Sequence, residues 1–203
     1  MARFTKFLTG LGLVLLLAGP VSAAVQVGKA APDFKLTSID GTDVSLSELS
    51  GKVVILEWFN RECPYVKKHY RNGDMQALQR EAVAKGVVWL TIDSTSQGHR
   101  SFTAPAEFKT LVADLGISST AVLSDASGDV GRTYGARTTP HMFIIGKDGT
   151  LLYQGAIDDN SSSHGDPKEA KNFVKAAIAE IEAGKAVSVS ESKPYGCSVK
   201  YSN

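Results

Sequence analysis

Short apolar runs and longer stretches of helical spacing alternate along the chain. A run that is apolar almost throughout is typical of a strand buried on both faces of a sheet. Runs that predict strands occupy residues 53–59, 87–92, 121–123, 142–145 and 150–154, and residues 34–46 predict two more around Asp40-Gly41. The turn Gly146-Lys147-Asp148-Gly149 joins the last two runs and predicts an antiparallel hairpin.

Helical spacing fills the intervals between these runs. It predicts helices over 64–70, 74–86, 105–115 and 130–134. Asp166-Pro167-Lys168-Glu169 has the signature of a helix start, with a capping Asp, Pro at the first position and Glu three residues after the cap. An apolar face then continues from Ala170 to Ile181. Strands that alternate with helices predict an α/β layer fold, and the hairpin makes its sheet mixed.

Composition is that of an ordinary globular protein. The chain has 203 residues, of which 43% are hydrophobic and 21% charged, enough for one domain with a substantial core. Its formal net charge of +1 gives no bulk signal for nucleic acid or for an anionic membrane. No internal repeat or linker divides the chain, so we expect a single folded domain.

The first residues have a different character. Arg3 and Lys6 precede an apolar stretch over 7–19, and small residues follow in Pro20-Val21-Ser22-Ala23-Ala24. This pattern predicts a secretory signal peptide that is cleaved after about Ala23, and the apolar stretch is too short to span a bilayer. We therefore expect an exported, periplasmic protein, in a compartment that permits disulfides.

Three segments follow from these boundaries. Residues 1–23 are the predicted signal peptide, residues 24–184 the folded domain, and residues 185–203 a C-terminal tail that carries Cys197. The chain has only two cysteines, Cys63 and Cys197, and both remain after cleavage. Paired-cysteine metal spacing is absent from the sequence, and we expect neither a metal nor a cofactor.

Cys63 is the leading candidate for chemistry. It follows the 53–59 run after a short polar turn, and Pro64 directly after it suits the first position of a helix. Unpaired backbone N–H groups and the positive end of the helix dipole stabilise a thiolate at such a position. The sequence therefore predicts a reactive thiol; the alternative is a buried, inert cysteine.

Several pieces of the chain, taken in order, resemble the thioredoxin-like redoxins, and among them the alkyl hydroperoxide reductase/thiol-specific antioxidant (AhpC/TSA) peroxiredoxin-like family. The matching pieces are residues 28–34, the strand and turn from Gly51 to Cys63, residues 122–125 with 134–135, and Thr139-Pro140 with 143–145. The resemblance implies a thioredoxin-like fold, a central mixed β-sheet flanked by helices with an N-terminal β extension. It also implies that Pro140 is cis and lies beside the active cysteine. The substrate groove would then be formed by Pro64, Tyr65, Thr139, Pro140 and His141.

Departures from the family pattern bear on the reaction. Thioredoxins carry Cys-x-x-Cys, whereas here Val66 stands at the position of the second cysteine. Peroxiredoxins carry Thr or Ser three residues before their cysteine, Pro seven before it, and an arginine three residues before the Phe-Ile-Ile strand. Those positions are Asn60, Leu56 and Pro140 in this chain. Asn60 and Arg61 are possible substitutes for the missing hydrogen-bond donors.

Two further residues are candidates because of their position. Glu57 lies six residues before Cys63, where thioredoxins hold a buried acid that moves protons, so it is a candidate general acid/base with a raised pKa. The alternative is a solvated side chain at the end of the sheet. His141 follows Pro140 and could favour the thiolate or join Cys63 as a metal ligand; alternatively it is an ordinary hydrogen-bonded side chain. His69 is expected to be solvated.

Cys197 leaves three possibilities open. It could resolve an oxidised Cys63 in a redox cycle, form a permanent disulfide that fixes the tail, or remain a separate thiol. Because Val66 has replaced the usual second cysteine, we favour the redox-linked pair.

The leading hypothesis is an exported thiol-dependent oxidoreductase of the redoxin type, with Cys63 as the nucleophile in thiol-disulfide exchange and Cys197 as its partner. One alternative is a peroxiredoxin-like thiol peroxidase with antioxidant activity. Another is a non-catalytic copper- or partner-binding module that uses Cys63 with His141. The expected partners are a thiol, disulfide or hydroperoxide substrate and an electron donor. We expect no nucleic acid and no stable membrane span after cleavage.

Overall fold

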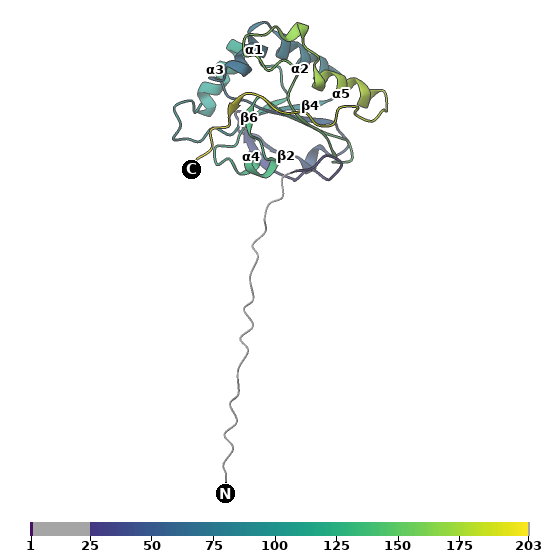
Figure 1. The fold of residues 1–203 in the computed structure, drawn as a ribbon. Helices are drawn as coiled ribbons and strands as arrows, with labels where there is room; N and C mark the ends of the chain where they lie inside the picture. The colour runs from purple at the N-terminus through teal and green to yellow at the C-terminus, as the bar shows by residue number, and fades with distance from the viewer. Residues whose placement is uncertain (2–24, 203) are drawn as a thin grey trace.

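The computed structural model describes Met1 and residues 25–202, so the predicted signal peptide lies outside the described residues. A seven-stranded sheet forms the centre of the domain (Figure 1). From one edge to the other, its strands are β2 (Asp43–Ser45), β1 (Lys35–Ser38), β5 (Ala121–Ser124), β4 (Val88–Asp93), β3 (Val54–Trp58), β7 (His141–Ile145) and β8 (Leu151–Gly155).

The sheet is mixed, as the sequence predicts. Strands β3, β4 and β5 run parallel, and β7 and β8 form the predicted antiparallel hairpin beside β3. Strands β1 and β2 form an antiparallel pair that extends the sheet at the β5 edge. This N-terminal extension and the mixed sheet confirm the expected α/β architecture.

Helices cover both faces of the sheet, and this places β3 at the centre of the molecule. Figure 1 shows α1 (Pro64–Arg71), α2 (Asp74–Ala84), α3 (Pro105–Leu115) and α5 (Phe173–Glu182) on one face and α4 (Asp129–Tyr134) on the other. A short 3-10 turn, η1 (Ser47–Leu49), follows β2.

Alternate residues of β3 serve two separate hydrophobic cores. Ile55 packs under the helices of the first face, while Val54, Leu56 and Trp58 belong to the core on the α4 face. All four side chains are buried. The continuous apolar run therefore reflects burial on both faces, and it fixes the position at which the chain leaves the sheet and reaches Cys63.

One predicted boundary is wrong. Asp166 caps only a 3-10 turn, η2 (Pro167–Glu169), and α5 begins at Phe173 with Asn172 as its cap. The chain is extended between them because Asn172 forms a β-bridge with Asp158, and the amide of Phe173 donates to the carbonyl of Ile157. Local capping chemistry at Asp166 is overridden by this tertiary pairing.

The C-terminal segment crosses the domain past β6 (Figure 1), and Tyr195 in this segment contacts α1. In this segment β9 (Cys197–Ser198) pairs antiparallel with β6 (Thr138–Thr139) to form a second, two-stranded sheet. The register sets Cys197 opposite Thr139, the residue before Pro140. Within the described residues, no helix has the length and apolar character needed to cross a membrane.

Candidate active site at Cys63 and Cys197

Cys63 is the N-cap of α1. Its amide donates to the carbonyl of Asn60 at 3.1 Å, which closes the turn that follows β3, and its own carbonyl accepts the amide of Lys67 at 2.9 Å. Pro64 occupies the start of the helix as predicted, and no side chain of the described residues caps this end. Cys63 therefore lies at the N-terminal end of α1, the end at which the helix dipole favours negative charge.

The Cys63 thiol lies against the loop that ends β6. Its Sγ donates to the carbonyl oxygen of Thr139 at 2.9 Å, and the peptide bond between Thr139 and Pro140 is cis. Cys63 is 1% exposed and Thr139 is also 1% exposed. The structure therefore brings the candidate nucleophile and the Thr-Pro pair together, although they are far apart in sequence.

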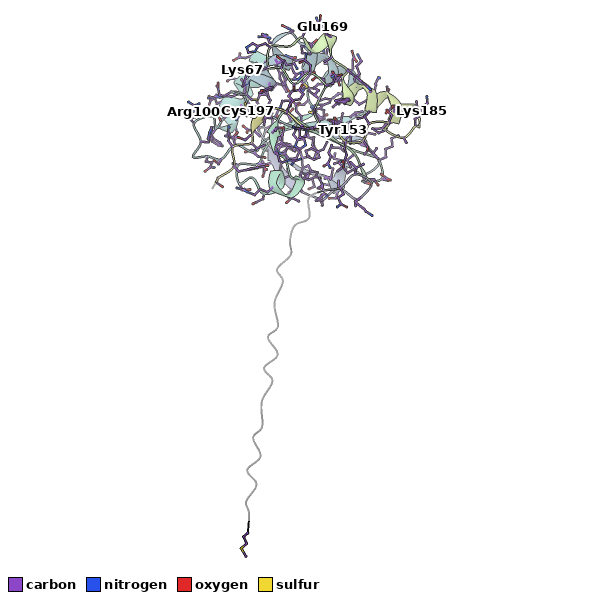
Figure 2. All side chains as sticks on the ribbon, in the orientation of Figure 1. Lys67, Arg100, Tyr153, Glu169, Lys185 and Cys197 are labelled. Carbon is purple, nitrogen blue, oxygen red and sulfur yellow. The ribbon has the colours of Figure 1, made fainter. Side chains whose placement is uncertain are left out.

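Cys197 reaches the same place from the tail. It lies opposite Thr139 in the β6–β9 pair and packs against the core that contains Cys63. Burial, followed by a hydrogen bond with the Cys63 side chain, raises the pKa of the Cys197 thiol to about 12. Both cysteines are free thiols here, and Cys197 is the more exposed of the two. Figure 2 marks Cys197 on the side of the domain where Lys67 of α1 also lies.

Glu57 is fully buried on β3, on the face that carries Cys63. Burial raises the pKa of its carboxyl group, against the opposing effect of four hydrogen bonds. The donors come from α1, α2 and β4, and they are Tyr70 Oη at 2.8 Å, Gln79 Nε2 at 3.0 Å, Trp89 Nε1 at 2.8 Å and Thr91 Oγ1 at 3.3 Å. The solvated alternative is wrong, whereas the proton-transfer role of Glu57 stays a prediction.

His141 does not approach the Cys63 sulfur. Its ring packs at a tilt against that of Phe143, with 4.5 Å between the ring centroids, and Nδ1 accepts the amide of Arg137 at 3.3 Å. Phe143 belongs to the α4-side core, while the next strand residue, Met142, packs in the core of Cys63. Alternation along β7 turns this ring to the face opposite Cys63, so a role of His141 beside the thiolate or as a metal ligand is wrong, and the alternative of an ordinary hydrogen-bonded side chain is confirmed.

Asn60 and Arg61 hold the turn between β3 and Cys63. A peroxidase would need their hydrogen-bond donors to be available to a peroxide. Both amide hydrogens of Asn60 are engaged, with Thr95 Oγ1 at 2.9 Å and Ser101 Oγ at 3.0 Å, and its Oδ1 accepts the amide of Glu62 at 3.0 Å. Arg61 forms an ion pair with Glu107 of α3. Asn60 thus shapes the turn that presents Cys63 and has no amide hydrogen left for a peroxide.

A buried polar cluster beside the tail was not predicted. It contains Lys68 and His69 of α1, Asp158 and the half-buried Tyr195. His69 is 1% exposed, so its expected solvation is wrong. The composition of Tyr195-Gly196-Cys197 was the one signal that the tail is ordered, and nothing in the local sequence connects it to Lys68 or Asp158. Among the residues that the structure describes, no group of three or more His, Cys, Asp and Glu side chains is arranged to hold a metal ion.

Comparison with known proteins places this site in a family. Residues 27–154, which include Cys63 and the Thr-Pro pair, match the AhpC/TSA family. The chain belongs to this family. The thiol-disulfide oxidoreductase ResA of Bacillus thuringiensis subsp. konkukian is 28% identical over 132 residues, which cover 64% of this chain and 69% of that protein.

Solved structures extend the likeness to nearly the whole domain. An uncharacterised conserved protein from Geobacillus kaustophilus is 28% identical, with a TM-score of 0.77, and the match covers 87% of this chain and 93% of that one. The thioredoxin domain of a thiol-disulfide oxidoreductase from Bacteroides vulgatus gives a TM-score of 0.51 at 17% identity, over 64% of this chain and 89% of that one. The fold of the AhpC/TSA member described here is thioredoxin-like, as expected.

Proposed function

We propose that this protein is an exported thiol-disulfide oxidoreductase in which Cys63 and Cys197 act as a redox pair. The observation that carries the proposal is that both cysteines meet Thr139: the Cys63 thiol donates to its carbonyl oxygen, and Cys197 lies opposite it in the β6–β9 pair. The tail supplies the second sulfur that Val66 cannot. Thiol-disulfide exchange needs this second sulfur to release a bound substrate.

The proposed cycle has two exchange steps. The Cys63 thiolate attacks one sulfur of a substrate disulfide, so that a mixed disulfide forms and the first substrate thiolate leaves and takes up a proton. Cys197 then loses its proton and attacks the Cys63 sulfur, which forms the Cys63–Cys197 disulfide and releases the second substrate thiol. The substrate gains two electrons, and a dithiol donor restores the pair by the reverse exchange.

The positions of the two thiols support different roles. Burial and the neighbouring Cys63 hold the pKa of Cys197 at about 12, so Cys197 is a protonated thiol at neutral pH. A thiol must lose its proton to attack. Cys63 has the helix N-terminus to stabilise its thiolate, so it is the better first nucleophile. Glu57 is a candidate acceptor for the Cys197 proton because burial raises the pKa of its carboxyl group.

Trapping with a small disulfide tests the cycle. Wild-type mature protein treated with oxidised glutathione should lose both thiols and yield a Cys63–Cys197 peptide pair on mass mapping. Cys197→Ser should stop at a one-to-one mixed disulfide between Cys63 and glutathione, and Cys63→Ser should lose the exchange activity. Undiminished disulfide turnover in Cys63→Ser would refute the proposal.

Hydroperoxide reduction is the competing function, and the occupied Asn60 amide disfavours it. Rapid cleavage of an O–O bond requires donors that stabilise the leaving oxygen. Within the described residues, the Asn60 amide hydrogens are both engaged, and Pro140 stands where the family arginine is expected. We expect Cys63 to react with hydrogen peroxide at about the rate of a free thiolate in a stopped-flow experiment. A rate larger by orders of magnitude would favour the peroxidase.

A further inference from the structure

The buried polar cluster beside the tail contains four side chains, which we call the tail latch: Lys68, His69, Asp158 and Tyr195. Lys68, His69 and Asp158 are each 1% exposed, while Tyr195 belongs to the C-terminal segment. Lys68 and His69 come from α1, the same helix that begins at Cys63. The latch therefore connects the helix of one cysteine with the segment of the other.

Hydrogen bonds and charge bind the latch together. The Tyr195 hydroxyl donates to Asp158 Oδ1 and lies 3.1 Å from His69 Nε2 and 3.4 Å from Lys68 Nζ. Lys68 Nζ also donates to the carbonyl of Asn160 at 2.5 Å and lies 3.6 Å from Asp158 Oδ2. The ammonium group lies 5.2 Å from the centre of the Tyr195 ring, which adds a cation–π contact. The hydroxyl thus has a defined acceptor and neighbouring donors.

Tyr195 is two residues before Cys197, so the latch fixes the approach of that thiol. Gly196 lies between them with φ of +141°, a conformation that L side chains rarely adopt. A Cβ at this position would collide with the carbonyl oxygen of Thr139, the oxygen that accepts the Cys63 thiol. The backbone of the tail therefore lies directly on the edge of the Cys63 site.

The other end of this segment is also held. The Tyr201 hydroxyl donates to the carbonyl of Ala136 at 2.7 Å, and its ring lies 4.6 Å from the Arg132 guanidinium. Lys200 accepts the amide of Ser96 at 2.8 Å through its carbonyl. Cys197 thus lies between two anchored tyrosines, in a segment beside Cys63, which is only 1% exposed.

We propose that Tyr195 is a positioning residue whose contacts with Asp158, Lys68 and His69 hold Cys197 against Cys63 and close the site. The inference deepens the proposed function and rests on it for the pairing of the two cysteines. With the latch closed, Cys197 has a high effective concentration at Cys63, and outside molecules reach Cys63 only when the tail lifts. The latch therefore sets both the stability of the disulfide and the access to Cys63.

The latch orders the tail in the reduced, dithiol form of the protein. A disulfide forms more readily when the dithiol form already holds its sulfurs together, because less chain entropy is lost on closure. A latch made of buried polar groups specifies one arrangement, since each buried donor needs its own acceptor. Loss of the Tyr195 hydroxyl leaves Asp158 and Lys68 with fewer partners and frees the tail in the dithiol form.

The redox equilibrium of the pair tests this. In glutathione buffers, Tyr195→Phe should shift the Cys63–Cys197 pair toward the dithiol, with an equilibrium constant for disulfide formation about tenfold lower than in wild type. Tyr134→Phe is the matched control, because the Tyr134 hydroxyl also bonds a backbone carbonyl, that of Pro32, but lies in the α4-side core. That control should leave the equilibrium unchanged. An unchanged equilibrium in Tyr195→Phe would overturn the proposal.

A second readout does not require the disulfide. In a Cys197→Ser background, the rate at which iodoacetamide alkylates Cys63 should rise about tenfold on adding Tyr195→Phe, and should not rise on adding Tyr134→Phe. A purely structural role would lower the melting temperature and leave native-state alkylation unchanged, which contradicts the proposal. If wild type forms no disulfide while the alkylation rates follow this pattern, the redox cycle fails but the latch stands.

Discussion

Cys63 and His141 lie on opposite faces of the central sheet: Cys63 packs in the core under α1, α2, α3 and α5, and His141 packs against Phe143 of the α4-side core. The sequence identifies Cys63 because three local features agree. The apolar run before it predicts a strand, the polar turn ends that strand, and Pro64 after it predicts the start of a helix. His141 follows Pro140 directly, but its side chain belongs to β7, where neighbouring residues face opposite cores. Adjacency along a strand therefore predicted the wrong face, and only the register with β3 shows the correct one.

His141 should make stability depend on pH. Burial, with a smaller effect from Arg137, lowers the pKa of His141 to about 3, whereas an unfolded histidine has an ordinary value near 6.5. The unfolded chain therefore binds a proton that the native state excludes, and stability falls as pH drops below about 6.5. Between pH 7.5 and pH 5 this group should remove about 2 kcal/mol from the free energy of unfolding.

The substitution His141→Phe isolates this contribution. At pH 7.5 it should cost about 1 kcal/mol, because the amide of Arg137 loses its acceptor. It should also abolish this part of the acid dependence, so that at pH 5 the variant is the more stable of the two proteins. Urea unfolding at pH 7.5 and pH 5 measures both effects. His69 has a similarly lowered pKa and stays in both proteins, so it cancels in the comparison. Equal acid sensitivity in the two proteins would contradict the assignment.

At the scale of elements, the strands and the first helices follow from the sequence because local pattern and tertiary packing agree there. The β3 run, the turn at Cys63 and the start of α1 are examples. Agreement fails where a distant partner decides the conformation. The extended chain before α5 depends on pairing with Asp158, and β9 forms only because β6 offers it an edge. Neither partner is visible in a local window.

The two capping residues near α5 provide a direct test. Asn172 Oδ1 accepts the amide of Lys175 at 2.8 Å and caps the helix, whereas Asp166 accepts the amide of Lys168 at 2.9 Å and caps only the η2 turn. We expect Asn172→Ala to lower the free energy of unfolding by about 1 kcal/mol, because an orphan helix donor loses its acceptor. Asp166→Ala should have a markedly smaller effect in the same urea titration. A larger destabilisation by Asp166→Ala than by Asn172→Ala would instead support a helix that begins after Asp166, as the sequence predicts.

At the scale of the whole molecule, the site depends on segments from both halves of the chain. The family match over residues 27–154 contains Cys63 and Thr139, but it ends well before Cys197. The second sulfur is contributed by the tail, which passes the latch and then pairs with β6. The sequence makes Cys197 a candidate by elimination, because Val66 stands at the position of the usual second cysteine. The sequence does not give the position of the Cys197 thiol, because that position depends on pairing with β6 and on the contact between Tyr195 and Asp158.

Oxidation of this pair should change the stability of the entire domain. A Cys63–Cys197 disulfide closes a long loop, and the chain-entropy model assigns such a cross-link about 5 kcal/mol of stabilisation. In the dithiol form Cys197 already lies opposite Thr139, whose carbonyl accepts the Cys63 thiol, so closure requires little rearrangement of the tail. Oxidised protein should therefore unfold at a higher urea concentration than protein kept in dithiothreitol. Cys197→Ser serves as the control, and its unfolding curve should be the same in both buffers.

If wild type also gives coincident curves, after mass mapping has established the disulfide, then the reduced chain must already be as constrained as the oxidised one. That result would place the stabilising effect in the tail contacts and not in the covalent bond.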